Sequence, residues 1–250
     1  INKGETVGII GGTGAGKSTL VSLIGRNYDV RSGQIKIAGK NIQDYKLETL
    51  RQHISYVLQN TSLISGTIKE NICMSKPYQE ETMNKALEVS QAKEFVSRLP
   101  QGIESAVVQG GKNFSGGQRQ RIGIARSLAL DPSFIICDEP VSALDVSIQS
   151  QIINLMKDMQ EEKNISYIFI SHDLSVVKHI SDRVGVMYLG SMMELADKNE
   201  IYSNPQHPYT RALIGAIPLP DPTKRKEMQV IQGEIPSNVN IPKGRKFKPR

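Results

Sequence analysis

The sequence predicts an α/β protein with a mostly parallel sheet, and three observations lead to this class. Apolar, β-branched runs alternate with helical patterns along most of the 250 residues, as expected when helices connect parallel strands. Hydrophobic residues make up 38% of the chain, which is enough to fill a core. A glycine-rich segment at residues 11–18 follows the first strand candidate and precedes a helix, the order of elements in a βα unit.

Six segments rich in β-branched residues are expected to form strands, at residues 5–10, 33–37, 54–58, 133–138, 166–171 and 183–188. The clearest helix is expected at about 147–162, where one face carries Ile148, Ile152, Leu155, Met156 and Met159. Residues 66–130 hold several helical stretches and no convincing strand. We therefore expect an inserted helical subdomain there, within a main domain that covers residues 1–220.

Prolines at 218, 220 and 222 end the regular part of the chain, and residues 221–250 are expected to form a basic, proline-punctuated tail. The formal net charge is +6, and most of it lies in this tail, where eight Lys or Arg accompany three acidic residues. No basic stripe with interleaved aromatic residues runs through the rest, so no specific nucleic-acid binding is expected. The tail is expected either to contact anionic lipid or to be solvated.

The composition also argues against a membrane-spanning helix, a disulfide scaffold and a zinc ribbon. No segment approaches the roughly 18 consecutive apolar residues that a membrane-spanning helix needs. Cys73 and Cys137 lie far apart in the sequence and fit neither a disulfide scaffold nor a zinc ribbon. The first residue is Ile1 and a strand-like run begins at once, which suggests a cropped or processed N-terminus.

The glycine-rich segment fits the pattern G-x-x-x-x-G-K-[ST], with the residues Gly11, Gly12, Thr13, Gly14, Ala15, Gly16, Lys17 and Ser18, followed by Thr19. Its glycines let successive backbone N–H groups turn toward phosphate oxygens, and the helix N-terminus adds partial positive charge. Lys17 is expected to bridge the outer phosphates and Ser18 to ligate Mg²⁺. The alternative is a glycine turn that binds nothing.

A second candidate group consists of Asp138 and Glu139, which lie at the end of the strand expected at 133–138. An aspartate leaving the sheet beside a phosphate loop is placed to hold Mg²⁺ through water, and the next glutamate to polarise an attacking water. Without the loop, these would be two solvated carboxylates. A third group, Ser115, Gly116, Gly117 and Gln118, precedes a helix expected at 119–129 and predicts a second anion-binding helix N-terminus.

Together these ordered motifs resemble the ATP-binding cassette (ABC) ATPase family over nearly the whole chain, a P-loop NTPase core. The resemblance implies that Gln59 touches Mg²⁺ and the attacking water and senses a membrane subunit, and that His172 contacts the γ-phosphate. It also implies that the loop at Asp145 contacts a second cassette. Two cassettes would pair head to tail, so that Ser115 and Gly117 of one complete the ATP site built by Lys17 and Glu139 of the other.

The chain departs from the family pattern near its beginning and in its subfamily character. No aromatic residue precedes Gly11 to stack on adenine, so weaker nucleotide binding and a truncated N-terminal antiparallel part are expected. Residues 1 to about 127 resemble exporter cassettes, whereas those from about 130 onward resemble ATP-binding subunits of oligopeptide and dipeptide importers. This predicts a mosaic with a seam near 128–131.

The C-terminal region carries two further expectations. The segment His207-Pro208-Tyr209-Thr210 is expected to open a structural helix through Ile217. Residues 231–250 contain no cysteine, so no iron-sulphur cluster is expected.

The function expected from the resemblance is ATP-driven transport, most simply of peptides, with ATP and Mg²⁺ as cofactors. The partners would be a second ABC ATPase subunit, transmembrane permease subunits and, for an importer, a substrate-binding protein. The location would be peripheral, at the cytoplasmic face of the cell membrane. The alternatives are an exporter cassette cropped from a fused membrane domain, a non-hydrolysing mosaic cassette, and an ABC ATPase acting on nucleic acid or ribosomes.

Overall fold

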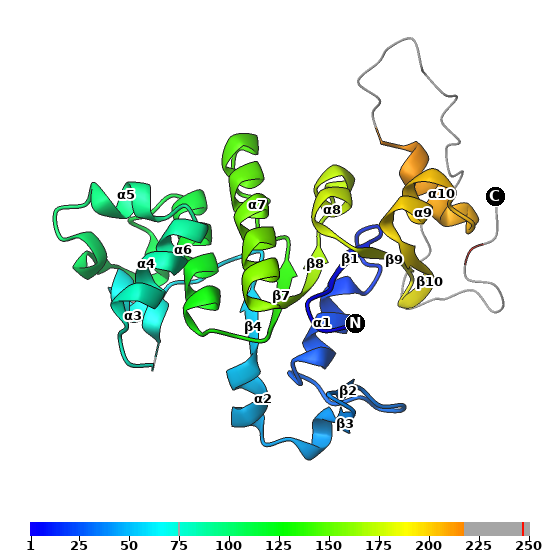
Figure 1. The fold of residues 1–250 in the computed structure, drawn as a ribbon, viewed down its shortest axis with the longest axis horizontal. Helices are drawn as coiled ribbons and strands as arrows, with labels where there is room; N and C mark the ends of the chain where they lie inside the picture. Colours follow the sequence, from blue (N-terminus) through cyan, green and yellow to red (C-terminus); the bar gives the residue numbers. More distant parts are fainter. Residues whose placement is uncertain (75, 218–246, 248–250) are drawn as a thin grey trace, which may run out of the picture. The chain divides into compact units, whose positions relative to one another are not determined.

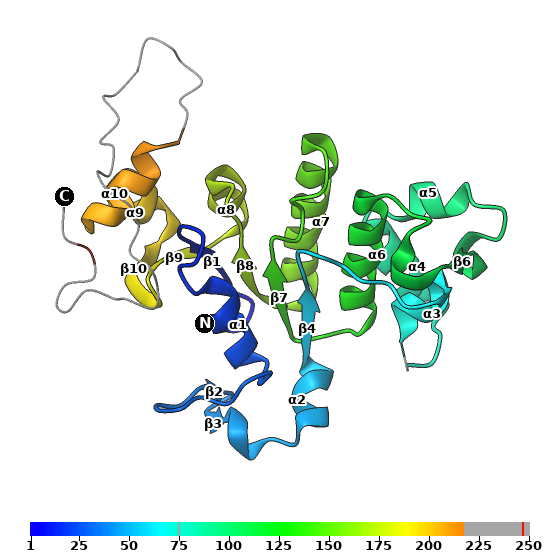
Figure 2. The ribbon, with the colours of Figure 1, turned by 180° about the vertical axis from the view of Figure 1, so that it is seen from behind.

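The elements of the chain are distributed over two compact units in the computed structural model, which describes residues 1–74, 76–217 and 247 (Figures 1 and 2). The first unit contains Ile1–Glu5 and Ser22–Ile168, and the second contains Thr6–Val21 and the described residues from Phe169 onward. Each unit therefore combines a short N-terminal segment with a much longer stretch. The tail predicted at 221–250 lies outside the described residues except for Phe247.

In the first unit, β4 (Ile54–Val57) and β7 (Phe134–Asp138) pair in parallel, with Ile54 opposite Phe134 and Val57 opposite Cys137. The central residues of β7 are completely buried, which agrees with the near-continuous apolar run typical of a parallel strand covered on both faces. The short strands β2 (Lys36–Ile37) and β3 (Lys40–Asn41) form an antiparallel pair. They are followed by the 3-10 turn η1 (Ile42–Asp44) and by α2 (Leu47–His53), which leads into β4.

Residues 66–129 of the same unit are mainly helical. They form α3 (Ile68–Cys73), α4 (Glu80–Val89), α5 (Lys93–Ser97) and α6 (Gly116–Ala129), with the 3-10 turns η2 (Gly102–Glu104) and η3 (Gln109–Gly111) between them. Helix α6 packs against α3, α4 and β4. The guanidinium of Arg126 on α6 donates to the backbone oxygen and the side-chain oxygen of Asn71 on α3, at 2.7 and 2.9 Å. This contact joins the two helices through a partly buried charge-assisted pair.

The longest helix is α7 (Val146–Lys163), one residue longer at each end than predicted. Of the predicted apolar stripe, Ile152, Met156 and Met159 are buried, whereas Ile148 and Leu155 are half-buried. The helix ends at Asn164, which takes a left-handed conformation with φ of 59°. Such a residue ends a helix because its backbone turns the chain away from the helical path. The next strand, β8 (Ser166–Ile170), crosses the boundary between the two units after Ile168.

The second unit contains β1 (Thr6–Ile10), β9 (Arg183–Tyr188) and β10 (Ser191–Asp197). Strands β1 and β9 are parallel, and β10 runs antiparallel to β9. Helix α1 (Lys17–Ile24) begins in this unit, which also holds α8 (Leu174–Ile180), α9 (Lys198–Ser203) and α10 (Pro208–Gly215). Mixed α/β structure with mostly parallel strand pairing confirms the predicted fold class.

Four details differ from the sequence prediction. The strand expected at 33–37 is reduced to Lys36–Ile37. Within 66–130, β5 (Gly66–Thr67) and β6 (Ala106–Val107) form a two-residue antiparallel pair. The helix expected at 119–129 starts at Gly116, because Ser115 caps it. Strand β10 was not predicted, since its side chains are half-buried or exposed and lack a β-branched run. Within the described part of the chain, no helix is both long and apolar enough to cross a membrane.

Candidate nucleotide-binding site

The glycine-rich loop lies in the second unit, between the end of β1 and the start of α1. Gly11 has φ of +149°, and a side-chain carbon placed there would lie 2.2 Å from the carbonyl oxygen of Met187. Gly16 has φ of +93°, and a side-chain carbon there would press on the Gly190 backbone at 3.3 Å. Only glycine combines these angles with such close backbone approach. Gly11 and Gly16 are therefore required by the fold of the loop itself.

Two elements of the second unit support the loop from outside. The N–H of Gly190, in the turn between β9 and β10, donates to the Ala15 carbonyl at 2.9 Å. The N–H of Gly12 donates to the phenolic oxygen of Tyr209 on α10, also at 2.9 Å. Since buried backbone groups that lose their partners cost free energy, both contacts fix the course of the loop.

Lys17, the first residue of α1, lies over the start of the loop. Its ammonium group donates to the carbonyl oxygens of Gly11 and Gly12, at 2.8 and 3.0 Å. The side chains of Thr13, Ser18 and Thr19 are exposed, whereas Ala15 is buried. A cation above a glycine loop that leads into a helix N-terminus makes a phosphate-binding arrangement.

His172 belongs to the same unit and follows β8. It is exposed, and the residues beside it hold the turn: the Ser171 hydroxyl accepts the N–H of Asp173 at 3.0 Å. The Asp173 carboxylate in turn caps α8 by accepting two backbone N–H groups, from Ser175 and Val176. Such capping fixes the start of the helix, so His172 projects from a well-defined turn.

The predicted acidic pair lies in the first unit, at the end of β7. Asp138 and Glu139 are half-buried, and Glu139 takes a left-handed backbone conformation with φ of 50°, which is uncommon for a residue with a side chain. The side-chain amide of Gln59 donates to the Glu139 carboxylate at 2.9 Å. The structure therefore brings these two predicted residues into direct contact, although 80 positions separate them in the sequence.

A buried glutamine that the sequence analysis did not select supports this contact. Gln120 on α6 is 2% exposed, and its amide nitrogen donates to the carbonyl oxygens of Leu58 and Pro140, at 3.1 and 2.8 Å. Its amide oxygen accepts the hydroxyl of Thr61 at 3.1 Å. Leu58 and Pro140 directly adjoin Gln59 and Glu139, so Gln120 bridges the two segments. Its only sequence signal is its place in the run that follows Ser115.

The predicted residues Ser115 to Gln118 form the start of α6. The Ser115 hydroxyl accepts the N–H of Gln118 at 3.2 Å, and the Gln118 side chain accepts the N–H of Ser115 at 2.9 Å. This reciprocal pair is a capping box, which satisfies two N–H groups that the helix leaves unpaired. Gly116 is exposed, with no atom within 4 Å of the position of an added side-chain carbon, whereas Gly117 is half-buried.

The loop that contains Asp145 lies beside this helix start. A side-chain carbon added to Gly117 would lie 3.2 Å from a methyl carbon of Leu144 and 3.4 Å from the carbonyl oxygen of Ala143. Asp145 caps α7 by accepting the N–H of Ile148 at 3.0 Å. The first unit thus groups the two segments that the family resemblance assigns to contacts with a second cassette.

The oxygen donors predicted to hold Mg²⁺ are of the right chemical type. The Gln59 amide nitrogen is used by Glu139, which leaves the amide oxygen to face a cation. Asp138 adds a half-buried carboxylate, and Ser18 an exposed hydroxyl at the start of α1. Hard divalent cations prefer such carboxylate, carbonyl and hydroxyl oxygens, so each of these side chains has the donor chemistry that the ion needs.

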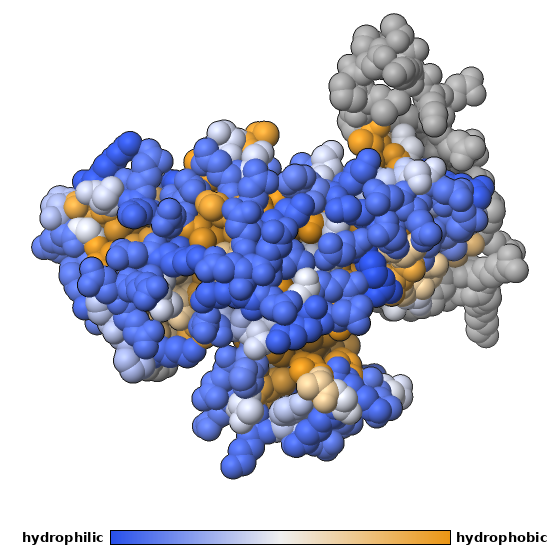
Figure 3. Space-filling model, viewed as in Figure 1, coloured by the Kyte–Doolittle hydropathy of each residue, from blue (hydrophilic) through white to orange (hydrophobic). Residues whose placement is uncertain are grey.

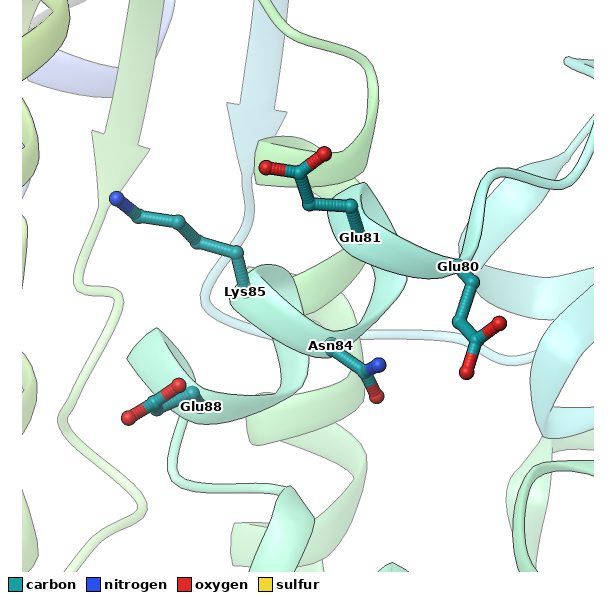
Figure 4. A pocket seen from close by; sticks show the side chains of 5 residues that line it. All are labelled: Glu80, Glu81, Asn84, Lys85 and Glu88. Carbon is teal, nitrogen blue, oxygen red and sulfur yellow. The ribbon is translucent and has the colours of Figure 1, made fainter.

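A separate surface hollow runs along α4 and is lined by Glu80, Glu81, Asn84, Lys85 and Glu88 (Figure 4). It contains none of the residues predicted to bind nucleotide, and its three carboxylates would repel phosphate groups. Most of the surface of the described residues is hydrophilic in the view of Figure 3, with apolar side chains showing in separate areas. Neither the hollow along α4 nor these apolar areas have the charge and backbone donors that a nucleotide site needs, so the glycine loop is the candidate site.

A glycine loop between a strand and a helix, with a lysine over its carbonyls, defines a P-loop nucleotide-binding protein. Residues 1–142 match the family model described as ABC transporter, and residues 193–250 match the one described as oligopeptide/dipeptide transporter, C-terminal region. The chain belongs to the ABC transporter family and is an ATP-binding ABC-type ATPase.

Similar proteins include transporter subunits from several bacteria. The oligopeptide transport ATP-binding protein AppF of Bacillus subtilis is 46% identical over 268 residues, covering 100% of this chain and 78% of AppF. A putative peptide import ATP-binding protein of Brucella ovis is 42% identical over 255 residues, covering 100% of this chain and 80% of that protein. Both alignments include residues 1–127 as well as the residues beyond them.

Among solved structures, a bacterial Atm1-family ABC exporter with ATP bound matches with a TM-score of 0.77 and 31% identity. The match covers 83% of this chain, which spans 36% of the exporter chain. The cassette fold is therefore shared between this chain and relatives whose names describe either import or export.

Proposed function

We propose that the chain is the ATP-hydrolysing subunit of a peptide transporter, and that it drives peptide uptake by binding and hydrolysing ATP. The observation that carries the proposal is the phosphate loop, with Lys17 bonded over the carbonyls of Gly11 and Gly12. The peptide assignment is supported by the match of residues 193–250 to the oligopeptide/dipeptide transporter region and by the names of the relatives.

In this proposal the residues of the second unit bind the triphosphate. Backbone N–H groups within the segment from Thr13 to Thr19 surround the phosphate oxygens, Lys17 neutralises the outer phosphates, and His172 contacts the γ-phosphate. Preorganised N–H groups and a cation stabilise phosphate charge because they need no rearrangement when the ligand arrives. The exposed Ser18 hydroxyl is one ligand for Mg²⁺, an ion that neutralises phosphate charge when bound.

The residues of the first unit contribute the chemistry of hydrolysis. Glu139 orients and polarises the attacking water, and its hydrogen bond to Gln59 supports this role because it fixes the direction of the carboxylate. Gln59 and Asp138 supply further oxygen ligands for Mg²⁺. The fixed geometry matters because a positioned base contributes to the rate only within hydrogen-bond reach of the proton it takes.

The remaining assignments concern assembly. Ser115, Gly116, Gly117 and Gln118 complete the ATP site of a second cassette, and Asp145 lies in the loop that contacts it. Permease subunits supply the membrane passage, which places the chain peripherally at the cytoplasmic face of the membrane, and a substrate-binding protein delivers the peptide. The catalytic domain covers residues 1–220 with a helical subdomain at about 66–130, and the basic, proline-punctuated segment 221–250 follows it in the sequence.

The proposal is tested in two stages. Lys17→Ala is expected to abolish ATP binding, and normal affinity in that variant would contradict the phosphate-loop assignment. The chain is then substituted for AppF in the Bacillus subtilis transporter, and uptake of a labelled oligopeptide is measured. Uptake that the wild-type chain restores and Glu139→Gln abolishes supports the peptide assignment. An assembled complex that hydrolyses ATP without moving peptide would refute it.

A further inference from the structure

The phosphate loop receives a contact from a residue of the C-terminal region, 197 positions away in the sequence. Tyr209 on α10 accepts the N–H of Gly12 through its phenolic oxygen at 2.9 Å. Tyr209 lies within the residues matched to the oligopeptide/dipeptide transporter C-terminal region, whereas Gly12 lies in the part matched to the general ABC family. Both residues belong to the second unit.

The N–H of Gly12 and the carbonyl of Gly11 are the two ends of one planar peptide group. Tyr209 accepts the N–H, and the Gly11 carbonyl accepts the ammonium of Lys17 at 2.8 Å. Because the peptide plane is rigid, rotating it would weaken both hydrogen bonds together. The orientation that Tyr209 selects is therefore the orientation that holds Lys17.

This peptide needs an external constraint because it joins two glycines. Rotation of this peptide plane changes ψ of Gly11 and φ of Gly12, and glycine populates left-handed and right-handed backbone regions with similar ease. The loop would therefore exchange between peptide orientations unless a partner selects one. A hydrogen bond from a rigid neighbouring element selects it.

Tyr209 is well suited to act as this neighbour, because its side chain is fixed from several sides. It is 3% exposed, and its ring packs against Tyr188 with ring centroids 4.6 Å apart and against Phe247 with centroids 5.5 Å apart. Burial raises the pKa of its phenol, and the nearby Tyr188 adds to this, against the lowering effect of the Gly12 N–H. The phenol therefore stays neutral over the physiological pH range.

The start of α10 is anchored in turn to β10. The Glu194 carboxylate accepts the N–H groups of Gln206 and His207, at 2.8 and 3.0 Å. The imidazole of His207 then caps the helix by accepting the N–H of Tyr209 at 3.1 Å. Pro208 occupies the first turn, where its missing N–H costs nothing. These contacts place the Tyr209 backbone without involving the phosphate loop.

We propose that Tyr209 is a positioning residue for the nucleotide site: its hydroxyl fixes the Gly11–Gly12 peptide and through it the ammonium of Lys17. The C-terminal region thereby takes part in ATP binding within one chain. This inference rests on the proposed function, since it requires the loop to bind ATP.

The test compares Tyr209→Phe, which keeps the ring and removes only the hydroxyl, with Tyr188→Phe, which removes a hydroxyl from the same aromatic cluster. Equilibrium binding of ATP, the KM and kcat of hydrolysis, and the thermal midpoint are measured for both variants and the wild type. For Tyr209→Phe we expect the Kd and KM for ATP to rise about three- to tenfold, the effect of one net hydrogen bond. The kcat is expected to stay close to wild type, and the thermal midpoint to fall by only about 2–4 °C, because the Gly12 N–H loses its acceptor.

For Tyr188→Phe we expect a Kd within about twofold of wild type. Equal affinity in Tyr209→Phe and wild type would overturn the inference while leaving the proposed function intact. Equal weakening in both variants would also overturn it, because the effect would then come from ring packing. A wild-type chain that binds no ATP would instead overturn the proposed function, and the inference with it.

Discussion

Replacing the buried Gln120 by leucine tests whether the contact between Gln59 and Glu139 depends on its supporting residue. Leucine has nearly the same size, so the substitution leaves little empty space and removes mainly the three hydrogen bonds of the amide group. The carbonyl oxygens of Leu58 and Pro140 lose a donor. The segments that carry Gln59 and Glu139 are then no longer joined through α6.

The magnitude follows from these contacts. Each net hydrogen bond contributes about 0.5–1.5 kcal/mol, and a buried acceptor left without a donor costs about 1–3 kcal/mol. We expect Gln120→Leu to lower the free energy of unfolding by about 2–4 kcal/mol and the thermal midpoint by roughly 5–15 °C. If Glu139 orients the water as proposed, kcat falls about ten- to hundredfold, because small misplacements of catalytic groups have such effects. The Kd for ATP stays near wild type, since Gln120 makes no described contact with the glycine loop.

The assays are thermal unfolding, ATP binding and steady-state hydrolysis, measured well below the midpoint of the variant. The matched control is Gln151→Leu, the same substitution at an exposed position of α7, which is expected to leave all three quantities near wild type. Unchanged turnover in a measurably destabilised Gln120→Leu would show that Gln120 supports only the fold. An unchanged free energy of unfolding in Gln120→Leu would contradict the expected loss of about 2–4 kcal/mol.

Three further outcomes are expected. Asp145→Ala removes the cap of α7 and lowers the free energy of unfolding by about 1 kcal/mol in chemical denaturation; no change would mean that water replaces the cap. Although burial raises the pKa of Glu194, the nearby Thr210 side chain and hydrogen bonds from two backbone N–H groups bring it below its ordinary 4.5, so its stabilising effect is complete above pH 4.5 and declines as the pH falls further. The difference in free energy of unfolding between wild type and Glu194→Gln should therefore become smaller as the pH falls below 4.5. A difference that does not change with pH would contradict this link between the Glu194 carboxylate and stability. Native-state thiol labelling should modify the partly exposed Cys73 and spare Cys137, which is buried and has a raised pKa; labelling of both at equal rates would contradict the burial.

The sequence predicted those strands whose residues are buried on both faces. The ranges expected at 54–58, 133–138 and 183–188 match β4, β7 and β9 to within one residue at each end, because complete burial demands a continuous apolar run. Among the described residues, strand β10 pairs with β9 alone, and it is partly exposed along its length. Such a strand does not require an apolar, β-branched run, so the sequence contains no pattern that predicts it.

Within the candidate site, features that depend on neighbouring residues were predictable from the sequence, whereas contacts between distant residues were not. The glycine loop was predictable because its pattern lies within eight consecutive residues and includes Gly11, Gly14 and Gly16, whose positive φ angles only glycine takes easily. The hydrogen bonds of Tyr209 to Gly12 and of Gln120 to Pro140 join residues that are 197 and 20 positions apart. No spacing rule predicts such contacts, so they required the folded chain. Gln59 was selected through the family resemblance, since an exposed glutamine at a strand end carries no signal of its own.

We propose above that this chain hydrolyses ATP through Glu139 in a site completed by a second cassette. The most direct measurement is steady-state ATP hydrolysis against protein concentration, for the wild type and for Glu139→Gln. We expect turnover that rises faster than linearly with protein concentration in the wild type and that disappears in Glu139→Gln, although this variant still binds ATP. Hydrolysis that is strictly proportional to concentration, or that persists in Glu139→Gln, would contradict it.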